Sequence, residues 1–291
     1  MAYDIHDLLR EYQRRQKENG AYVKFFNQSD TRTLYPKHWE FFDAGKTHRQ
    51  RLFRAANRVG KTTAAGCELV YHLTGEYPEQ WKGKTFDGAS SWWVCGKSSE
   101  TIRQILQPLL LGEIGNFGTG LVPKDKLDAE SLTDAKKAAT GISTFRVMHK
   151  SGGWSQVEFK AYEQGRQAFE GTARSIWMDE ESNSDVYAEC LLRTMTGDNI
   201  LLLTFTPLKG ASEVVMNFSK DGSFEDGSIG NGKYVVTCTW DDVPHLDDAA
   251  KAELLASIPP YQRDARSKGI PALGAGAIYP IPEEELFVDP F

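Results

Sequence analysis

The segment AANRVGKTT at residues 55–63 limits the folds open to this chain more than any other feature. Before it, RLFRAA (51–56) has the composition of a short strand, and after it KTTAAGCELVYHL (61–73) has that of a helix. A strand, a turn that ends in Gly-Lys-Thr and a helix together predict a phosphate-binding loop. In such a loop, backbone N–H groups and the helix N-terminus bind the anion, and Gly60 lets the backbone come close to it.

The side chains of this loop have predictable roles. We expect Lys61 to reach the β- and γ-phosphates of a nucleotide and Thr62 to offer its hydroxyl to Mg²⁺. Ala55 stands where the motif usually has its first glycine, and alanine tolerates positive φ poorly. The alternative is a helix N-terminus that merely contains Gly-Lys-Thr. The predicted nucleotide-binding residues of the loop are Ala55, Asn57, Arg58, Val59, Gly60, Lys61, Thr62 and Thr63.

The rest of the chain alternates between strand-like and helix-like blocks. Further strands are predicted at 91–96, 173–179, 199–206 and 233–240, with a hairpin at 142–149 and 154–161. Helices are predicted at 4–18, 98–114 (bent at Pro108), 185–195, 247–258 and 259–269, and a loop at 219–232. This alternation predicts an α/β fold with helices on both faces of a mostly parallel sheet.

Composition narrows the function classes. The chain has 291 residues and a formal net charge of −6, which argues against a surface that binds polyanions everywhere but allows a local basic groove. Its cysteines lack the spacing of a zinc site or a disulfide framework, so we expect free thiols in a reducing compartment. We also expect no signal peptide and no membrane helix, which needs roughly 20 apolar residues. The cysteines are Cys67, Cys95, Cys190 and Cys238.

A second signal is SIWMDEE (175–181), an apolar strand that ends in three carboxylates. In phosphate-loop enzymes the acid at the end of such a strand holds Mg²⁺, and we assign that role to Asp179. Glu180 is then placed to orient and deprotonate the attacking water, which favours hydrolysis over phosphoryl transfer to a metabolite. Glu181 is a second candidate for this base. The alternative is the solvated acidic start of a helix.

Two further segments bring polar groups toward this expected site. The apolar strand LLLTFTP ends in Thr204 and Thr206, whose hydroxyls could sense the γ-phosphate and pass its loss to neighbouring elements. On the loop EQGRQAFEG, Arg166 could reach a γ-phosphate in a neighbouring subunit, and Arg58 competes for this role within the same chain. The alternatives are an ordinary strand end and a surface ion pair.

An aromatic segment, LYPKHWEFF (34–42), precedes the phosphate loop. Tyr35, Pro36 and Trp39 could form an apolar wall against an adenine ring, and His38 could supply a polar contact. A cluster of aromatic side chains in the core is an equally good interpretation.

Together these five segments resemble the ATPase motor domain of the large terminase subunits of tailed bacteriophages. The shared features are a deviant phosphate loop that contains an arginine, the aromatic-proline segment, the WMDEE strand end and the TFTP strand end. TWDDVPHL (239–246) and RDARSKGIPALGAGAIYP (263–280) are also similar to that family, so the resemblance covers about residues 20–280. The chain departs from the pattern at Ala55, and at His38, where many members have an adenine-reading glutamine.

The resemblance implies a P-loop NTPase fold of the RecA-like class that has an additional strand and a catalytic glutamate (ASCE). It divides the chain into an N-terminal helical arm (1–30), an ATPase core (31–210) and a helical lid or linker subdomain (211–291). The nuclease domain that follows in the family is not expected in this chain. The roles carried over are those of Lys61, Thr62, Asp179, Glu180, Thr204 and Thr206.

The implied function is Mg²⁺-dependent ATP hydrolysis that drives double-stranded viral DNA into a procapsid in the host cytoplasm. Expected partners are DNA, the portal protein, the small terminase subunit and further copies of this chain, in a ring expected to be a pentamer. The DNA-contacting residues are not predicted, since the scattered Lys124, Lys126, Lys136 and Lys137 fit solvated loops. The alternatives are another translocating ATPase or helicase, and a nucleotide-binding module that docks on a portal without hydrolysis.

Overall fold

The structure is a computed structural model that describes residues 25–28, 30–132 and 141–271. The helix predicted at 4–18, most of the predicted arm at 1–30, and Lys136 and Lys137 therefore lie outside the described residues.

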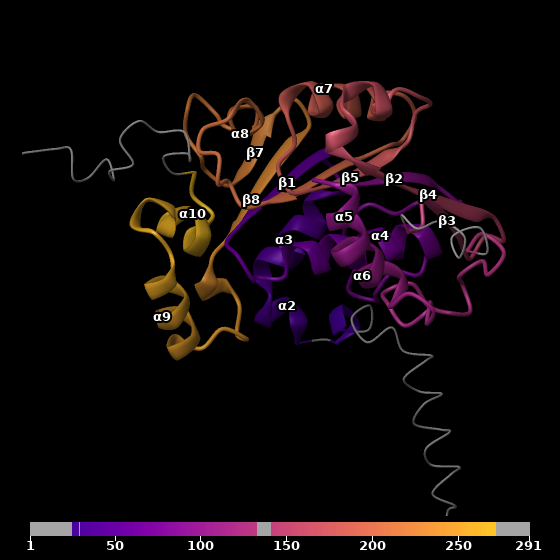
Figure 1. Ribbon diagram of the computed structural model, residues 1–291, viewed down its shortest axis with the longest axis horizontal. Helices are drawn as coiled ribbons and strands as arrows, with labels where there is room; N and C mark the ends of the chain where they lie inside the picture. Colours follow the sequence, from indigo (N-terminus) through magenta and orange to yellow (C-terminus); the bar gives the residue numbers. More distant parts are fainter. Residues whose placement is uncertain (1–24, 29, 133–140, 272–291) are drawn as a thin grey trace, which may run out of the picture.

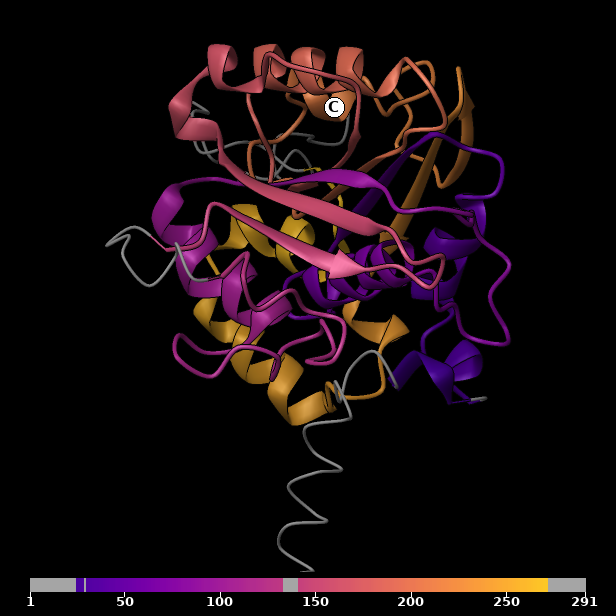
Figure 2. The ribbon, with the colours of Figure 1, turned by 90° about the vertical axis from the view of Figure 1, so that its right-hand side faces the viewer.

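One eight-stranded sheet runs through the described chain, in the order β3-β4-β2-β5-β6-β1-β8-β7 (Figures 1 and 2). The inner strands are parallel to one another, and β3 and β7 pair antiparallel at the two edges. The strands are β1 Gln50–Ala55, β2 Ser91–Gly96, β3 Thr144–Met148, β4 Trp154–Ala161, β5 Ser175–Asp179, β6 Leu201–Phe205, β7 Gly227–Gly230 and β8 Lys233–Cys238.

The predicted α/β fold is confirmed, and β6 lies between β1 and β5 as the expected additional strand. The loop predicted at 219–232 is wrong in part, because Gly227–Gly230 forms β7. This segment, Gly-Ser-Ile-Gly, has two glycines with positive φ and one apolar side chain, so its sequence has no apolar pattern that marks a strand. Pairing with β8 makes it one.

The helices divide between the two faces of the sheet. In Figures 1 and 2, α7 and α8 lie on one face, and α3, α4, α5 and α6 lie on the other. The helices are α2 Thr31–Leu34, α3 Pro36–Ala44, α4 Lys61–Thr74, α5 Ser99–Thr101, α6 Gln107–Leu111, α7 Ser184–Thr194, α8 Glu213–Met216, α9 Asp248–Ser257 and α10 Arg263–Lys268.

The helix predicted at 98–114 is shorter and less regular than expected. Its hydroxyl cap is confirmed, since Ser98 Oγ accepts from the Thr101 N–H. The irregularity is a π-helical turn at Ile102–Leu106, which ends two residues before Pro108. The helix ends at Leu111 because Gly112 turns the chain with φ of 90°.

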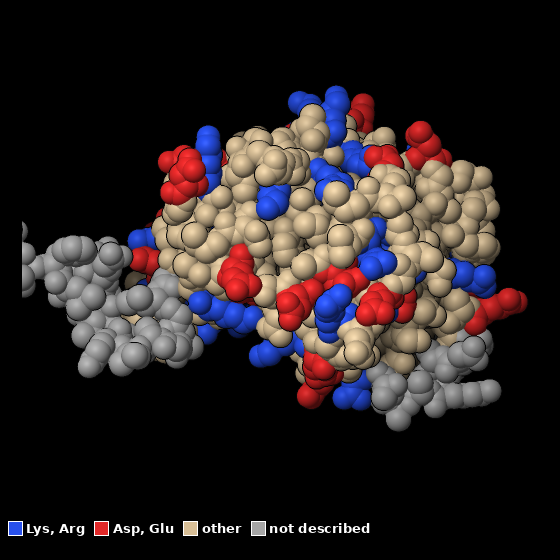
Figure 3. Space-filling view, turned by 90° about the horizontal axis from the view of Figure 1, so that it is seen from above, with Lys and Arg blue, Asp and Glu red and all other residues tan. Residues whose placement is uncertain are grey.

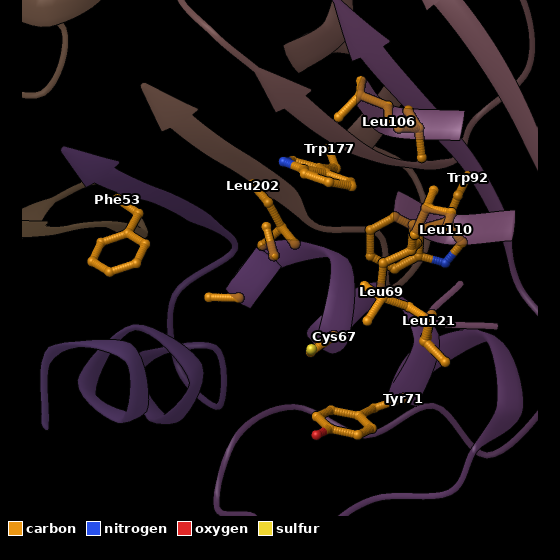
Figure 4. Packing of buried hydrophobic residues seen from close by; sticks show 14 of the residues in the cluster. Phe53, Cys67, Leu69, Tyr71, Trp92, Leu106, Leu110, Leu121, Trp177 and Leu202 are labelled. Carbon is orange, nitrogen blue, oxygen red and sulfur yellow. The ribbon is translucent and has the colours of Figure 1, made fainter. Parts of the chain in front are cut away.

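Side chains that alternate along the strands pack into two separate hydrophobic cores, one on each face of the sheet. Trp92 belongs to the cluster around α4, and its neighbour Trp93 belongs to the cluster under α7. Figure 4 shows Trp92, Trp177 and Leu202 gathered beside Leu69 of α4. All four cysteines are buried, and none of them forms a disulfide. No described helix is long and apolar enough to cross a bilayer.

The residues from Thr239 to Pro271, here called the lid segment, follow β8 and contain α9 and α10. The predicted division at residue 210 stays a prediction. However, β7 and β8 come from the part assigned to the lid, and they complete the sheet beside β1.

Candidate active site

The carboxyl ends of β1, β5 and β6 meet at one edge of the sheet and bring the predicted acidic residue to the phosphate loop. Asp179 is buried, and its Oδ1 accepts hydrogen bonds from Thr62 Oγ1 (3.0 Å) and Thr204 Oγ1 (2.7 Å). The indole N–H of Trp177 in turn donates to Thr204 Oγ1 (2.9 Å). The structure therefore brings together Thr62, Asp179 and Thr204, which come from three different segments.

Asp179 is an unfavourable place for a lone negative charge. Burial, together with the nearby Glu180 carboxylate, raises the pKa of Asp179 to about 7, against the opposing effect of Lys61. A hydroxyl and a desolvated carboxylate that share this spot fit Mg²⁺, which takes oxygen ligands and fills its shell with water and phosphate. Among the described residues, no cluster of three or more His, Cys, Asp or Glu side chains could hold a metal alone.

Glu180 stands in a strained turn directly after β5. Its φ is 63°, a left-handed value that is uncommon outside glycine. The Glu180 N–H donates to the Thr204 carbonyl (2.9 Å), and the Tyr162 hydroxyl lies 3.2 Å from the Glu180 carbonyl. Its carboxylate Oε1 lies 3.5 Å from Lys61 Nζ. The turn thus aims the predicted base at the predicted phosphate-binding lysine.

The phosphate loop does not need a glycine at its first position. Ala55 is the last residue of β1, buried and in register with Cys238 of β8, and it is not among the residues with positive φ. The left-handed positions are Arg58 (φ 64°) and Gly60 (φ 83°), the latter capping α4. The Thr206 hydroxyl donates to the Ala55 carbonyl (2.7 Å) and so fixes the start of the loop.

A cavity of about 940 Å³, here called the phosphate cavity, opens over these groups. Predicted site residues line it, among them Arg58 and Lys61 from the phosphate loop and its helix, and Glu180 from the turn after β5. Other charged residues also line it, and sequence reasoning missed them because no motif marks them. The lining residues used below are Asn57, Arg58, Lys61, Tyr162, Glu180 and Thr206, and the missed charged residues are Lys97, Glu163 and Lys209.

A second cavity of about 410 Å³, here called the base cavity, lies on the other side of the loop and is rich in aromatic rings. Tyr35 and His38 line it as predicted, together with Phe25, Phe26 and His245. Trp39, by contrast, packs in the core against Phe26 and Phe42 and donates to Thr31 Oγ1 (3.3 Å). The core interpretation holds for Trp39, while Tyr35 and His38 line the cavity and their predicted contact with adenine stays a prediction.

His38 is held in one protonation state. It is 2% exposed, and burial lowers its pKa to about 4, so the ring is neutral. Its Nε2–H donates to the Val59 carbonyl (2.8 Å), because a carbonyl can only accept. Nδ1 is therefore an acceptor, and it has no hydrogen-bond partner among the described residues.

Arg166 is not brought to the phosphate cavity of its own chain. Its side chain is 63% exposed, and its Nε lies 3.2 Å from the buried carboxylate of Glu189, whose other oxygen Arg193 contacts. The bonds from Arg193 and then Arg166 lower the pKa of Glu189. Arg58, in contrast, lines both cavities.

Trp240, His245 and Tyr162 also contact the two loops, and none of them was singled out from the sequence. Trp240 and His245 lie in TWDDVPHL, so the available signal was the similarity of that segment to the family. Tyr162 is buried in a 3₁₀ turn after β4, and no sequence signal marks it.

Comparisons with known proteins agree with one another. Residues 52–286 match the family described as "Terminase large subunit, T4likevirus-type, N-terminal". The chain is 35% identical over 278 residues to "Terminase, large subunit" of Salmonella phage P22, covering 88% of this chain and 54% of that protein. It is 29% identical over 275 residues to the corresponding protein of Enterobacteria phage LP7, covering 89% and 56%. The chain thus spans about half the length of these curated relatives.

Solved structures show the same fold. The ATPase domain of the large terminase of Thermus phage P74-26 superposes with a TM-score of 0.56 at 13% identity, covering 82% of this chain and 96% of that domain. The large terminase of another thermophilic bacteriophage, in complex with ADP, gives a TM-score of 0.56 at 10% identity, covering 82% and 53%.

Proposed function

We propose that this chain, which belongs to the family of phage terminase large subunits and corresponds to their N-terminal part, hydrolyses ATP to move double-stranded viral DNA into a procapsid. The observation that carries the proposal is the meeting of Lys61 and Glu180, 3.5 Å apart, beside the buried Asp179. A phosphate-binding lysine and a carboxylate base that face each other across one cavity fit hydrolysis of a phosphoanhydride. The thermophilic phage terminase solved with ADP, which shares the fold, was also solved with ATP-γ-S.

The residues divide the reaction between them. Lys61 and the loop amides bind the phosphates, while Thr62 and Asp179 would hold Mg²⁺, which neutralises phosphate charge when bound. When a triphosphate engages Lys61, Glu180 is released from its ion pair. Its carboxylate can then orient a water molecule and accept the proton.

Strand β6 connects the two sides of the site. Thr204 Oγ1 bonds Asp179 at the end of β5, and Thr206 Oγ1 bonds Ala55 at the end of β1. A shift of either loop on phosphate loss therefore moves β6 and the chain that leaves its end. This supports the coupling role of the two threonines.

The transition-state arginine in this proposal is either Arg166 from a neighbouring chain or Arg58 within the same chain. Arg166 is exposed on its own subunit and does not line that subunit's phosphate cavity, which fits action on a neighbour.

Assembly in a ring, with the portal, small subunit and DNA as partners and the host cytoplasm as location, follows from family membership as part of the proposal. Charges of both signs are interspersed on the face over α7 in Figure 3.

A mixing experiment tests the proposal. ATP turnover per subunit is measured against protein concentration for the wild type, Arg166→Ala and Glu180→Ala, and then for mixtures of the two variants. We expect each variant alone to be slow and the mixture to regain activity, because the Glu180→Ala subunit supplies Arg166 to its neighbour's intact base. If the wild type neither binds nor hydrolyses ATP more than Lys61→Ala does, with DNA present, the proposal is wrong.

A further inference from the structure

The phosphate loop is held from outside by groups that its own motif does not contain. The indole N–H of Trp240 donates to the Asn57 carbonyl (2.8 Å), and His245 Nε2 lies 2.8 Å from the Arg58 carbonyl. The Asn57 N–H donates to the Arg266 carbonyl of α10 (2.8 Å). All three contacts come from the lid segment, about 180 to 210 positions later in the chain.

These contacts set the direction of the loop's carbonyls. An anion-binding turn works when successive N–H groups converge on the ligand, which requires the carbonyls between them to point away. Carbonyls that turn inward would oppose the phosphates. Arg58 is the position where this matters most, because a side-chain-bearing residue holds φ of 64° there only if its surroundings enforce it.

His245 is fixed from both sides of its ring. Nε2 must carry the proton, since the Arg58 carbonyl can only accept. Nδ1 then accepts from the Tyr35 hydroxyl (3.2 Å), and the two rings lie 6.0 Å apart at 21°. Tyr35 thus orients His245, and His245 holds the loop.

We propose that Trp240 and His245 are positioning residues for nucleotide binding, which hold the Asn57 and Arg58 carbonyls outward and keep the phosphate loop preformed only while the lid segment is docked. A similar arrangement exists at the other loop of the site. In the turn after β5, Glu180 also has a left-handed φ, and the Tyr162 hydroxyl contacts its carbonyl. Arg58 differs because the group that contacts its carbonyl, His245, belongs to the lid segment, whereas Tyr162 lies in the 3₁₀ turn directly after β4.

The inference rests on the proposed function for its ATP readout, but not for its structural readout. The test uses Trp240→Phe, which keeps a smaller aromatic ring at this position and removes the N–H, together with His245→Ala and the double variant. Mg-ATP affinity is measured by competition with a fluorescent nucleotide. Amide hydrogen exchange of residues 56–60 is measured in the nucleotide-free protein.

Each single variant should weaken ATP binding about fivefold, and the double variant about twentyfold, because each removes one net hydrogen bond of order 1 kcal/mol. Turnover at saturating ATP should stay near wild type, since the bound phosphates then hold the loop. Loop amides should exchange faster in the free double variant and return to the wild-type rate with ATP. Tyr35→Phe should give a smaller loss of affinity in the same direction.

Matched controls remove equivalent groups elsewhere. Trp81→Phe removes an indole N–H that donates to the Lys84 carbonyl (2.9 Å), and His48→Ala removes a ring that bonds Ser228 Oγ (2.9 Å). Both should leave ATP affinity and loop exchange unchanged. Unchanged loop exchange in the double variant would overturn the inference, as would equal losses of affinity in the controls. A wild type that binds no ATP would overturn the proposed function instead, and loop exchange would still decide the inference.

Discussion

The phosphate cavity and the base cavity lie on two sides of one loop but are built differently. At the phosphate cavity the groups assigned to the reaction are charged and stand at the ends of parallel strands, as with Glu180, which lines the cavity directly after β5, and the buried Asp179 that ends this strand. In the base cavity the groups are rings, and the one buried ionisable group, His38, is kept neutral. The sheet topology therefore determines where the charged groups of the phosphate cavity lie. The shape of the base cavity depends instead on contacts between distant segments.

The change with the greatest predicted effect tests whether chemistry resides on the phosphate side alone. Glu180→Gln should lower ATP turnover about 10²–10⁴-fold, since it removes a general base, while ATP affinity stays near wild type. Steady-state phosphate release and nucleotide titration measure the two quantities. The matched control is Glu181→Gln, whose carboxylate Oε1 is already bonded to Ser212 Oγ (2.5 Å). Equal losses from both changes would remove Glu180 from its assigned role.

The second largest effect is predicted for the pH dependence of the free energy of unfolding, through His38 in the base cavity. The folded pKa of His38 is about 4 and its ordinary value is 6.5, so the unfolded chain gains a proton first as the pH falls. The contribution of His38 to the free energy of unfolding should be constant above pH 6.5 and decline between pH 6.5 and 4, by about 3 kcal/mol in total. Asp179, whose raised pKa acts in the opposite direction, contributes equally to wild type and His38→Gln, so the difference between their unfolding free energies in urea at several pH values measures this decline. A parallel decline in wild type and His38→Gln would contradict it, and His48→Gln is the control.

A smaller effect tests how β6 supports the start of the loop. Thr206→Val keeps the shape of the side chain but leaves the Ala55 carbonyl without its 2.7 Å hydrogen bond. We expect the free energy of unfolding to fall by about 1–3 kcal/mol. Thr206→Ser, which retains the hydroxyl, should lose less. The hydroxyl is dispensable if Val and Ser prove equally stable.

The least effect is predicted for the residue that departs from the usual motif. Ala55→Gly restores the common glycine, yet it should lower the free energy of unfolding by about 0.5–1 kcal/mol and leave ATP affinity unchanged. The reason is that Ala55 is a strand residue without positive φ. Thermal denaturation and nucleotide titration measure the two quantities, and a gain in affinity would contradict the prediction.

The sequence predicted the phosphate cavity better than the base cavity for a physical reason. Asp179 and Glu180 stand at the end of an apolar strand, and Lys61 begins the helix that follows another strand of the sheet. Local pattern and the rule that parallel strands end at one edge therefore place them together. Tyr35 bonds His245 across 210 positions, and no local pattern contains that distance. Trp39 and His38 are adjacent and both are buried, and only the helix α3 that carries them decides which one lines the base cavity.

The strands were likewise predictable where the sequence has an apolar pattern. A segment that becomes a strand only by pairing with a neighbouring strand was not predictable. The buried strands β2, β5, β6 and β8 have apolar runs, whereas β7 is a strand only because β8 lies beside it. Trp240 and His245 lie in a recognisable segment, but their contact with Asn57 and Arg58 depends on how the lid segment folds back on the loop.

The position of β1 in the sheet has a consequence for how the molecule forms. β1 is an early segment of the chain, yet it pairs with β6 and β8, which begin at Leu201 and Lys233. On the ribosome, the strand that carries the phosphate loop must therefore wait with both edges open until most of the chain has emerged. Such distant parallel pairing is slow, and it exposes apolar edges to other chains meanwhile. Chaperone dependence and aggregation of shortened nascent chains are the expected signs of this delay.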